Sequence, residues 1–384
     1  MDATATAKIP RAFMDMPDPR RFNRRHRLID ILTIALFAVL GGAEDWVNVE
    51  DYGHAKFDWL KTFLELPHGI PSHDTFSRLF ARLDPHAFES CFRTWMATLV
   101  DLSGGKLVAI DGKSLRRSFE HAWDKSGMAH MVSAFVEGNQ VVFAQEKTDG
   151  KGQELSAIDH LLSVLDLDGA VISIDAIGTQ KNVASNILKA GAHYILQVKD
   201  NQPTLHAKLA LAMDEAILDG FKGQASDCFE QTDAGHGRIE TRKLWVCWDT
   251  GELLGDLAGE WPGLKALIAI ERTREFTGKD GTPKTSIERH YYISSLDRRT
   301  KAKRLAGYVR GHWSVENNLH WQLDVSFRED ERRIRKGHGA ENFSRLCRTA
   351  LNLLKNETTA KGGIANRRKK CGWDNDYLIK VVAR

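Results

Sequence analysis

Apolar residues recur at intervals of three and four from Leu28 to Leu102, which is the period of an α-helix. The clearest example is ILTIALFAVL (31–40), whose composition predicts a buried helix. Similar stretches follow, separated by short polar segments with turn-forming and capping residues. We therefore predict a small all-α domain over residues 28–104, preceded by a basic arm over residues 1–27.

A strand pattern replaces the helical pattern after residue 104. Three short runs, LVAID (107–111), HMVSAFV (130–136) and QVVFAQ (140–145), are separated by polar segments, as in a β-meander. The apolar strands AVISID (170–175) and YILQV (194–198) then alternate with amphipathic helices. Such alternation is typical of a sheet that is buried on both faces, and it predicts a mixed α/β domain.

A second strand-rich region interrupts this α/β domain. Its strands are expected at residues 238–248, 264–270 and 286–293. The helical period returns only at Lys301, and the helix needed to complete the α/β domain lies beyond this point. We therefore predict an α/β domain formed by residues 105–221 and 297–358, with a β-rich insertion over residues 222–296.

Charge is distributed unevenly along the chain. The net charge of the 384 residues is only +3, but residues 298–384 contain 21 Lys and Arg against 9 Asp and Glu. The first 27 residues are also basic, and we expect residues 359–384 to form a basic tail. Basic ends around an acidic middle suggest a polyanionic partner, although many basic tails are merely solvated.

Cysteine usage and hydropathy exclude several classes of protein. The five cysteines are scattered, which excludes a disulfide framework and a zinc ribbon and fits a reducing cytoplasm. The longest apolar run, residues 31–43, is far shorter than the roughly 20 residues of a membrane span. We therefore expect a cytoplasmic protein without a membrane partner.

Two aspartates occupy the same kind of position. Asp111 ends LVAID and Asp175 ends VISID, so each carboxylate follows an apolar strand. In α/β sheets, ligands bind at the carboxyl ends of the strands. Either aspartate alone could simply cap the next helix, but together they favour a site for a hard cation such as Mg²⁺.

A third acid is expected in YVRGHWSVENNLHWQLDVSFRED (308–330). His312, Glu316, His320 and Asp324 follow one another at steps of four and form a polar stripe opposite an apolar face. A solvated stripe is the alternative interpretation. A self-contained zinc site is less suitable, because the HExxH spacing is absent and no cysteine is near.

Several strings of residues resemble one known family. They are DPRRFNRRHRLIDILTIALFAVLGGAEDW (18–46), GIPSHDTFSRLFARLDPHAFE (69–89), IDGKSLRRS (110–118), ISIDAIGTQKNVASNI (172–187), HYILQVKDNQPTL (193–205), HGRIETR (236–242) and HWSVENNLHWQLDVSFRED (312–330). Together they resemble the DDE insertion-sequence transposases of the ISAs type, which include the H-repeat-associated proteins. The resemblance covers nearly the whole chain and extends to the transposase-associated N-terminal domain.

The resemblance implies a fold and an activity. The fold is an RNase H-like α/β core with a β-rich insertion, preceded by the all-α domain and followed by basic helices. The activity is Mg²⁺-dependent or Mn²⁺-dependent cleavage and strand transfer at the ends of a DNA element. Asp111, Asp175 and Glu316 would be both the catalytic acids and the ligands of two metal ions. Double-stranded DNA would be the partner of a dimer or higher oligomer in the nucleoid.

Residues that could contact DNA are cationic or polar and lie near these acids or on the last helices. They are Lys113, Arg116, Arg117, Lys199, Asn201, His236, Arg238, Arg242, Arg310, His312, Arg345 and Arg348. Related transposases carry a Tyr–Arg–Glu–Lys signature around the glutamate, whereas this chain has His312 in place of the arginine. Arg310, His312 and Asp324 are the candidate substitutes. Trp313 and Trp321 are expected to pack in the core rather than to stack on bases.

Two other functions remain open from the sequence. One is an RNase H-like metal-dependent nuclease that does not transfer strands. The other is a domesticated DNA-binding relative that has lost the reaction. The three intact acids argue against the second alternative.

Overall fold

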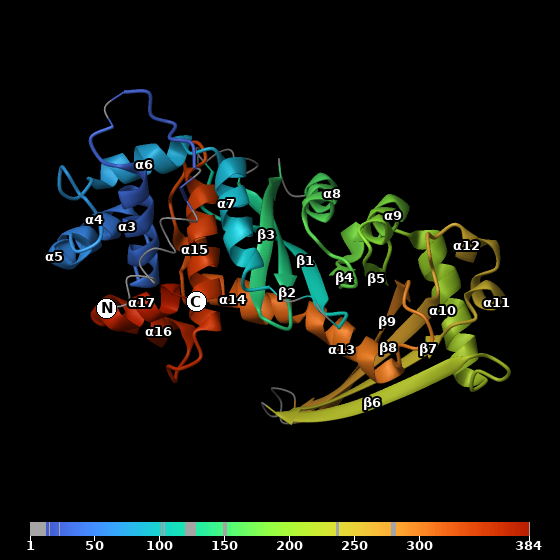
Figure 1. Ribbon diagram of the computed structural model, residues 1–384. Coiled ribbons are helices and arrows are strands. Elements are labelled where there is room, and N and C mark those ends of the chain that lie inside the picture. The colour runs from blue at the N-terminus through green and yellow to red at the C-terminus, as the bar shows by residue number, and fades with distance from the viewer. Residues whose placement is uncertain are drawn as a thin grey trace. The chain divides into compact units, whose positions relative to one another are not determined.

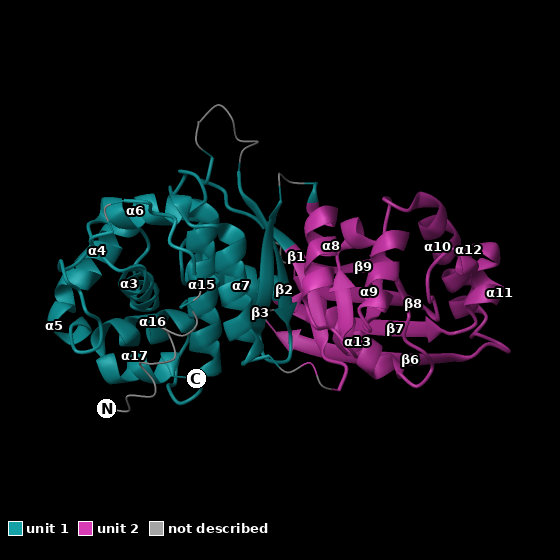
Figure 2. Ribbon diagram, turned by 45° about the horizontal axis from the view of Figure 1, so that its top comes forward, with its two compact units in different colours: residues 1–101, 112–153, 315–384 teal, residues 102–111, 154–314 magenta. Residues whose placement is uncertain are grey.

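The computed structural model describes residues 13–14, 16–22, 24–100, 102, 104–119, 128–148, 152–235, 238–277 and 282–383. The chain divides into two compact units, and each of them collects segments that are distant in the sequence (Figure 2). Unit 1 contains residues 1–101, 112–153 and 315–384, and unit 2 contains residues 102–111 and 154–314. These units do not coincide with the domains expected from the sequence.

The first part of unit 1 is helical, as predicted for residues 28–104. Its helices are α3 (Leu28–Leu40), α4 (Trp46–Ala55), α5 (Phe57–Leu60), α6 (His73–Arg82) and α7 (Pro85–Ala97). Every residue of α3 from Asp30 to Leu40 is buried, which explains its continuous apolar run. Asp45 and Asp84 begin α4 and α7 by accepting hydrogen bonds from backbone N–H groups three residues later.

Helix α15 (Gly339–Asn356) is the central helix of unit 1 (Figure 1). It packs against α3, α6, α7 and strand β3 (Val141–Thr148), which pairs in antiparallel fashion with β2 (His130–Val136). Asn342 of α15 donates its side-chain amide to the carbonyls of Phe80 and Leu83, both at 2.9 Å. The C-terminal part of the chain therefore completes the core of the N-terminal helices.

The C-terminal region, expected to contain basic helices and a basic tail over residues 359–384, is helical. Residues in this region form α16 (Ile364–Trp373) and α17 (Asn375–Val382). The guanidinium of Arg368 is buried, and it donates to the carbonyls of Val39, Ala43 and Ser326. Arg368 thus satisfies backbone carbonyl groups inside unit 1. A count of charges along the sequence does not distinguish such a buried arginine from an exposed one.

Unit 2 is built on a mixed sheet. Its strands are β1 (Leu107–Ser114, shared with unit 1 from Gly112 on), β4 (Val171–Ile174), β5 (His193–Val198), β6 (Ser226–Gly235), β7 (Arg238–Cys247), β8 (Ala266–Thr277) and β9 (Pro283–Ser294). Their spatial order is β1-β4-β5-β9-β8-β7-β6. The pairs β1–β4 and β4–β5 are parallel, whereas β5–β9 and the pairs from β9 to β6 are antiparallel.

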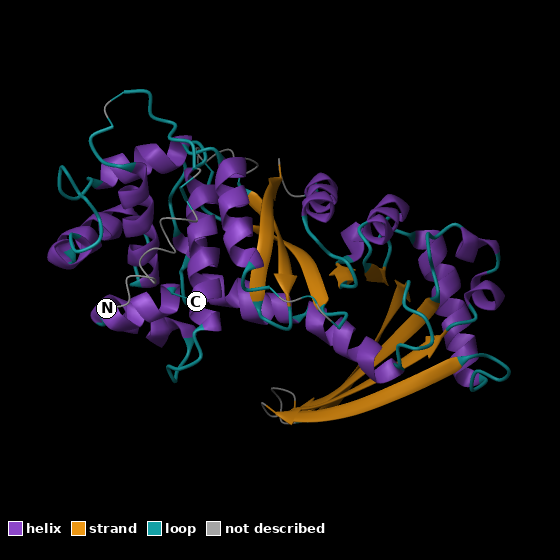
Figure 3. Ribbon diagram, in the orientation of Figure 1, coloured by secondary structure: helices purple, strands orange, loops and turns teal. Residues whose placement is uncertain are grey.

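Helices connect and cover these strands. They are α8 (Glu154–Val164), α9 (Lys181–Lys189), α10 (Pro203–Leu218), α11 (Thr250–Leu254), α12 (Asp256–Gly259) and α13 (Ala302–His312). An apolar cluster joins α13 to the sheet through side chains such as Leu305, Val309, Leu244 and Ile268. The expected mixed α/β fold is confirmed (Figure 3). The strands of the β-rich insertion come before α13, the helix that leads to Glu316.

Strand β6 (Ser226–Gly235) was not among the strands located from the sequence. Most of its residues are polar and exposed, so they lack the regular alternation of apolar and polar residues that marks a strand. Pairing with β7 along its whole length explains why it is nevertheless extended. In the described part of the chain, no helix has the length and apolar character needed to span a membrane.

Candidate active site

Strand pairing brings the two predicted aspartates to one edge of the unit 2 sheet. In the parallel pair β1–β4, Ile110 is the partner of Ile174. Asp111 and Asp175 are the next residues on these two strands, so their positions are adjacent at the carboxyl ends. Both side chains are half-buried. This arrangement matches the edge at which ligands bind in α/β sheets.

Asp175 also begins a short helix, as the alternative interpretation proposed. Its Oδ1 accepts a hydrogen bond from the Ile177 backbone N–H at 3.1 Å, at the start of the 3₁₀ helix η2 (Ala176–Gly178). Burial raises the pKa of Asp175, and the nearby negative charge of Glu154 raises it further. A carboxylate has about four acceptor sites, so capping is compatible with holding a cation.

Glu154 is an acid near this site that the sequence analysis missed. It is the first residue of α8, its exposed fraction is only 7%, and its charge acts on Asp175. A glutamate in the first turn of a helix is ordinary, because it interacts favourably with the helix dipole. No sequence signal therefore distinguished it from a structural residue.

A hydrogen bond links α13 to the strand that carries Asp175. His312, the last residue of α13, lies with its Nδ1 2.9 Å from the Oγ of Ser173 on β4. Burial lowers the pKa of His312 to about 4, and the positive charge of Lys199 acts in the same direction. The imidazole is therefore neutral at physiological pH, so it does not offer the positive charge expected of the arginine that it replaces.

Glu316 lies in unit 1, four residues after the end of α13. It begins the π-helix η3 (Glu316–His320), a rare conformation that is frequent at functional sites. The His320 Nδ1 lies 3.1 Å from Glu316 Oε2, and this hydrogen bond lowers the pKa of Glu316 more than burial raises it. The predicted apolar face is confirmed, since Val315, Leu319 and Leu323 are fully buried.

The predicted polar stripe is not one continuous helix. α13 ends at His312, η3 follows, and α14 (Trp321–Val325) completes the segment. Glu316 and His320 remain in contact, but Asp324 instead accepts a hydrogen bond from Lys113 Nζ at 2.8 Å. The change from α-helix to π-helix alters the direction of side chains that a regular four-residue step would align.

Three cations after Asp111 have different environments within unit 1. Lys113 is buried to an exposed fraction of 9%, and its ammonium group binds Asp324 and Asp330. Arg116 is exposed and forms an ion pair with Asp330 at 3.0 Å. Arg117 is also exposed. Of the three, Arg116 and Arg117 present the more accessible positive charge.

Polar residues after β5 lie at the same edge of unit 2 as Asp175. Lys199 is exposed, and its charge lowers the pKa values of both Asp175 and His312. Asn201 donates its side-chain amide to the carbonyl of Ala176, so it braces the turn that follows Asp175. Lys199 lies at the edge expected from its position after an apolar strand, whereas the bracing contact of Asn201 depends on the folded structure.

The predicted cations of the insertion lie on β7 and α13. Arg242 binds Asp233 and Glu240, both at 2.8 Å. Arg238 lies 3.6 Å from Glu240, and Arg310 lies 3.2 Å from Asp233. All three are at least partly exposed. His236 lies outside the described residues.

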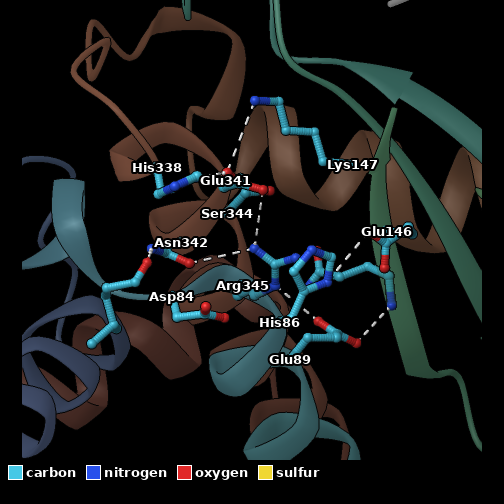
Figure 4. A network of polar contacts seen from close by, with 12 residues as sticks. Asp84, His86, Glu89, Glu146, Lys147, His338, Glu341, Asn342, Ser344 and Arg345 are labelled. Atoms are coloured by element: carbon cyan, nitrogen blue, oxygen red, sulfur yellow. Dashed lines mark hydrogen bonds and ion pairs between the residues drawn. The ribbon is translucent and has the colours of Figure 1, made fainter. Parts of the chain in front are cut away.

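The assignment of Arg345 and Arg348 to DNA binding was wrong. Their exposed fractions are 1% and 0%, because α15 is buried on all sides rather than on one face. Arg345 donates to Glu89 at 2.9 Å and also contacts Glu341 (Figure 4). Arg348 donates to Glu329 at 2.9 Å. Both arginines neutralise acids inside unit 1 and cannot reach a polyanion at the surface.

The two tryptophans that flank Glu316 are not core residues. Trp313 has an exposed fraction of 52% and Trp321 one of 53%, so the prediction that they pack in the core was wrong. Val315, Leu319 and Leu323 form the buried apolar face of this segment. The two tryptophans do not belong to that face, and they are therefore exposed. Half-exposed tryptophans remain available for contacts with a partner.

Two family models match the chain. Residues 102–353 match the family described as "Transposase DDE domain", and residues 11–96 match the one described as "DDE_Tnp_1-associated". The chain belongs to the DDE transposase family. This finding confirms the family that the sequence strings resemble.

Two relatives from Escherichia coli support the same assignment. "Putative transposase YncI" of Escherichia coli O157:H7 is 40% identical over 369 residues, which cover 96% of this chain and 92% of that protein. "H repeat-associated putative transposase YhhI" of Escherichia coli strain K12 is 38% identical over 374 residues, or 96% of each chain. A piggyBac transposase in a synaptic complex with hairpin DNA aligns with a TM-score of 0.42 and 12% identity, over 97% of this chain and 77% of that one.

The donor chemistry of these residues suits a hard divalent cation. Asp111 and Asp175 provide carboxylate oxygens at one edge of the sheet, and the acid Glu154 acts on the same aspartate. Burial and a neighbouring negative charge both disfavour the ionised form of Asp175, and a bound cation would reverse this effect. Oxygen ligands of this kind are preferred by Mg²⁺ and Mn²⁺.

Proposed function

We propose that this DDE transposase cleaves DNA at the ends of an insertion sequence and joins the freed ends to target DNA. The observation that supports the proposal most strongly is the adjacency of Asp111 and Asp175 at the ends of two parallel strands. The family of the chain and its transposase-named relatives support the same reaction.

Glu316 is proposed as the third acid of the site. The bond between His312 and Ser173 holds the end of α13 against β4, one residue before the last residue of that strand. Only three residues separate His312 from Glu316. A chain of this length spans at most about 13 Å, which limits the distance between His312 and Glu316. The chain length is therefore compatible with a role of Glu316 at the edge that carries Asp175.

Asp111, Asp175 and Glu316 would hold one or two Mg²⁺ or Mn²⁺ ions. Such ions activate a water molecule or a 3′-hydroxyl group and stabilise the leaving oxygen in a displacement at phosphorus. Glu154 adds negative charge beside Asp175, and the ammonium group of Lys199 provides a positive charge for a phosphate at the same edge. His312 stays neutral and holds α13 in place.

The proposed substrate is double-stranded DNA that contains the terminal repeats of the element and the target. Joining two element ends requires that they be held together, so we propose a dimer or higher oligomer on DNA. The proposed location is the nucleoid in the cytoplasm, where this substrate lies. Lys199, Arg238, Arg242 and Arg310 are the proposed DNA contacts in unit 2, with Arg116 and Arg117 in unit 1.

The test is cleavage of labelled element ends by the purified full chain with Mg²⁺ or Mn²⁺. Glu316→Gln and Asp111→Asn should each abolish 3′-end nicks, because they remove a charge that holds a cation without changing side-chain size. Both variants should keep the melting temperature and DNA affinity of the wild type. Glu215→Gln, an exposed position on α10, is the matched control and should cleave normally.

Different results would separate the alternatives. Nicks without joined products would indicate a nuclease that does not transfer strands. Undiminished cleavage in excess chelator, or by Glu316→Gln, would contradict the proposed site. Binding to element ends without any cleavage in either metal would indicate a relative that has lost the reaction.

A further inference from the structure

One face of the β-rich insertion carries a group of arginines around a single buried acid. Strand pairing places Glu240 of β7 opposite Arg274 of β8, and Arg242 opposite Arg272. Arg238 lies two residues before Glu240 on the same strand, so its side chain emerges on the same face. We call these four residues, Arg238, Arg242, Arg272 and Arg274, the arginine cluster.

Glu240 is the centre of this cluster. Its exposed fraction is 5%, and its carboxylate lies 2.8 Å from Arg242, 3.6 Å from Arg238, 3.8 Å from Arg274 and 4.0 Å from Arg272. The arginine side chains are themselves accessible, with exposed fractions from 23% for Arg272 to 49% for Arg238. The acid thus lies below a layer of guanidinium groups that remain open to solvent.

The carboxylates on this face do not balance its arginines. Asp233 pairs with Arg242 and Arg310, and Glu288 pairs with Arg272. Among the described residues of this face, five arginines therefore share three carboxylates. Four guanidinium groups close to one carboxylate repel one another, and this repulsion decreases when an external anion approaches.

Two arginine nitrogens on this face lack a hydrogen-bond acceptor. The Nε atoms of Arg272 and Arg274 are buried, and neither donates a hydrogen bond within the described parts of the chain. Their contacts with Glu240 are ion pairs at 4.0 and 3.8 Å, too long for hydrogen bonds. The cluster therefore keeps donor capacity and positive charge beyond what its own acids use.

The position of the cluster on the sheet leaves it accessible. Nearer the core, the same face carries Leu244 and Ile268, which α13 covers. Beyond the cluster, Phe276 is opposite Arg238 and has an exposed fraction of 39%. The uncovered end of this face thus combines arginines with an exposed aromatic ring, a combination that suits phosphates and bases.

We propose that the arginine cluster binds the phosphate backbone of DNA, with Arg272 and Arg274 as principal contacts and Phe276 beside a base or sugar. Glu240 is an internal counter-anion that holds the arginines in place before DNA binds and limits their affinity. The surface deepens the proposed transposase function by naming where a DNA substrate is held. The proposal concerns binding only and includes no step of the chemistry.

The first experiment measures affinity for duplex DNA in EDTA, so that cleavage cannot contribute. Arg272→Gln/Arg274→Gln should weaken binding at least tenfold at low salt and reduce the slope of log K against log salt by about 2, one unit for each lost phosphate contact. The control is Lys243→Gln/Arg289→Gln, two cations on the opposite face of the same sheet. The control should retain wild-type affinity and slope.

The second experiment uses a variant that should strengthen DNA binding. Glu240→Gln removes the counter-anion, so affinity for duplex DNA should rise several-fold and the salt slope should steepen by about 1. A merely structural Glu240 would give unchanged or weaker binding. The melting temperature of each variant shows whether it is folded, and the arginine variants test the surface even if Glu240→Gln is unstable.

Failure of this proposal is distinguishable from failure of the proposed function. Wild-type affinity and slope in Arg272→Gln/Arg274→Gln would overturn the binding surface, whether or not the protein cleaves DNA. Binding that depends on these arginines would support the surface even if cleavage of element ends were never observed. Equal loss in the arginine variant and the opposite-face control would also overturn the proposal, because it would show a general charge effect.

Discussion

Burial lowers the pKa of Lys355, whose side chain contacts the segment that carries Glu316. Lys355 of α15 donates from Nζ to the carbonyl of Asn318, within η3, at 2.6 Å. The same ammonium group lies 5.0 Å from the centre of the Phe135 ring. Burial lowers the pKa of Lys355 from 10.5 to about 7. Lys355 thus links α15 to η3, and its burial disfavours the charged form of its amino group.

This shift predicts how stability depends on pH. Between about pH 7 and pH 10.5 the unfolded chain binds the Lys355 proton and the folded chain does not. The free energy of unfolding should therefore rise with pH in this window through this group. Lys355→Met should remove that contribution, measured as the difference between urea unfolding curves of variant and wild type at several pH values. If the difference in the free energy of unfolding between Lys355→Met and wild type does not change with pH, the lowered pKa of Lys355 is contradicted.

At the scale of elements, α15 depends on ion pairs that are hidden from solvent. Arg345 pairs with Glu89 of α7, and Glu89 also accepts a hydrogen bond from the Gln145 backbone N–H on β3 at 2.9 Å. Burial raises the pKa of Glu89 to about 7, and the charge of Arg345 opposes this rise. Three elements of unit 1 therefore meet at one buried carboxylate (Figure 4).

Removing one partner of this pair should be costly. Arg345→Met leaves Glu89 buried without its cation, and we expect a loss of about 3–5 kcal/mol in the free energy of unfolding. The double variant Arg345→Met/Glu89→Leu should recover part of this loss, because the uncompensated charge of Glu89 is then absent, whereas Glu341 still lacks its contact with Arg345. Urea denaturation measures both effects. A loss below about 1 kcal/mol, the range of exposed ion pairs, would show that the pair is solvated.

At the scale of the whole molecule, each unit is assembled from distant parts of the chain. Unit 1 joins the N-terminal helices to α15, α16 and α17, and Lys56 near the N-terminal end donates to Asn375 at 2.8 Å. Tyr377 of α17 donates to the buried carboxylate of Glu357 at 2.9 Å. The C-terminal helices therefore belong to the folded core of unit 1.

Because the C-terminal helices are part of this core, we expect Arg368 to stabilise the fold rather than to bind DNA. Arg368→Ala removes the guanidinium donor from the carbonyls of Val39, Ala43 and Ser326, of which Val39 keeps a hydrogen bond from the Gly42 N–H. Each carbonyl left unsatisfied costs about 1–3 kcal/mol. The variant should have a lower melting temperature and an unchanged salt slope for DNA binding. Lys369→Ala/Lys370→Ala is the matched control, because both lysines are exposed, and it should keep its melting temperature. An unchanged melting temperature in Arg368→Ala would contradict the buried role.

Features that depend on local pattern can be predicted from the order of residues alone. Periods of two and 3.6 residues located most strands and helices, and the apolar runs before Asp111 and Asp175 placed both acids at strand ends. Glu316 is predicted as the third acid from the string of residues that resembles the family and from its place in the stripe of polar residues at steps of four. The β-rich insertion followed from the order of these patterns.

Tertiary structure decided the environment of each charge, because burial depends on contacts between distant segments. Arg345, Arg348 and Arg368 have the same sequence character as Arg116 or Arg310, yet the first three are enclosed and the last two are exposed. Strand pairing, which no local period encodes, surrounded Glu240 with four arginines from two strands. The positions of charges along the chain are therefore local information, whereas their partners and solvent access are properties of the folded molecule.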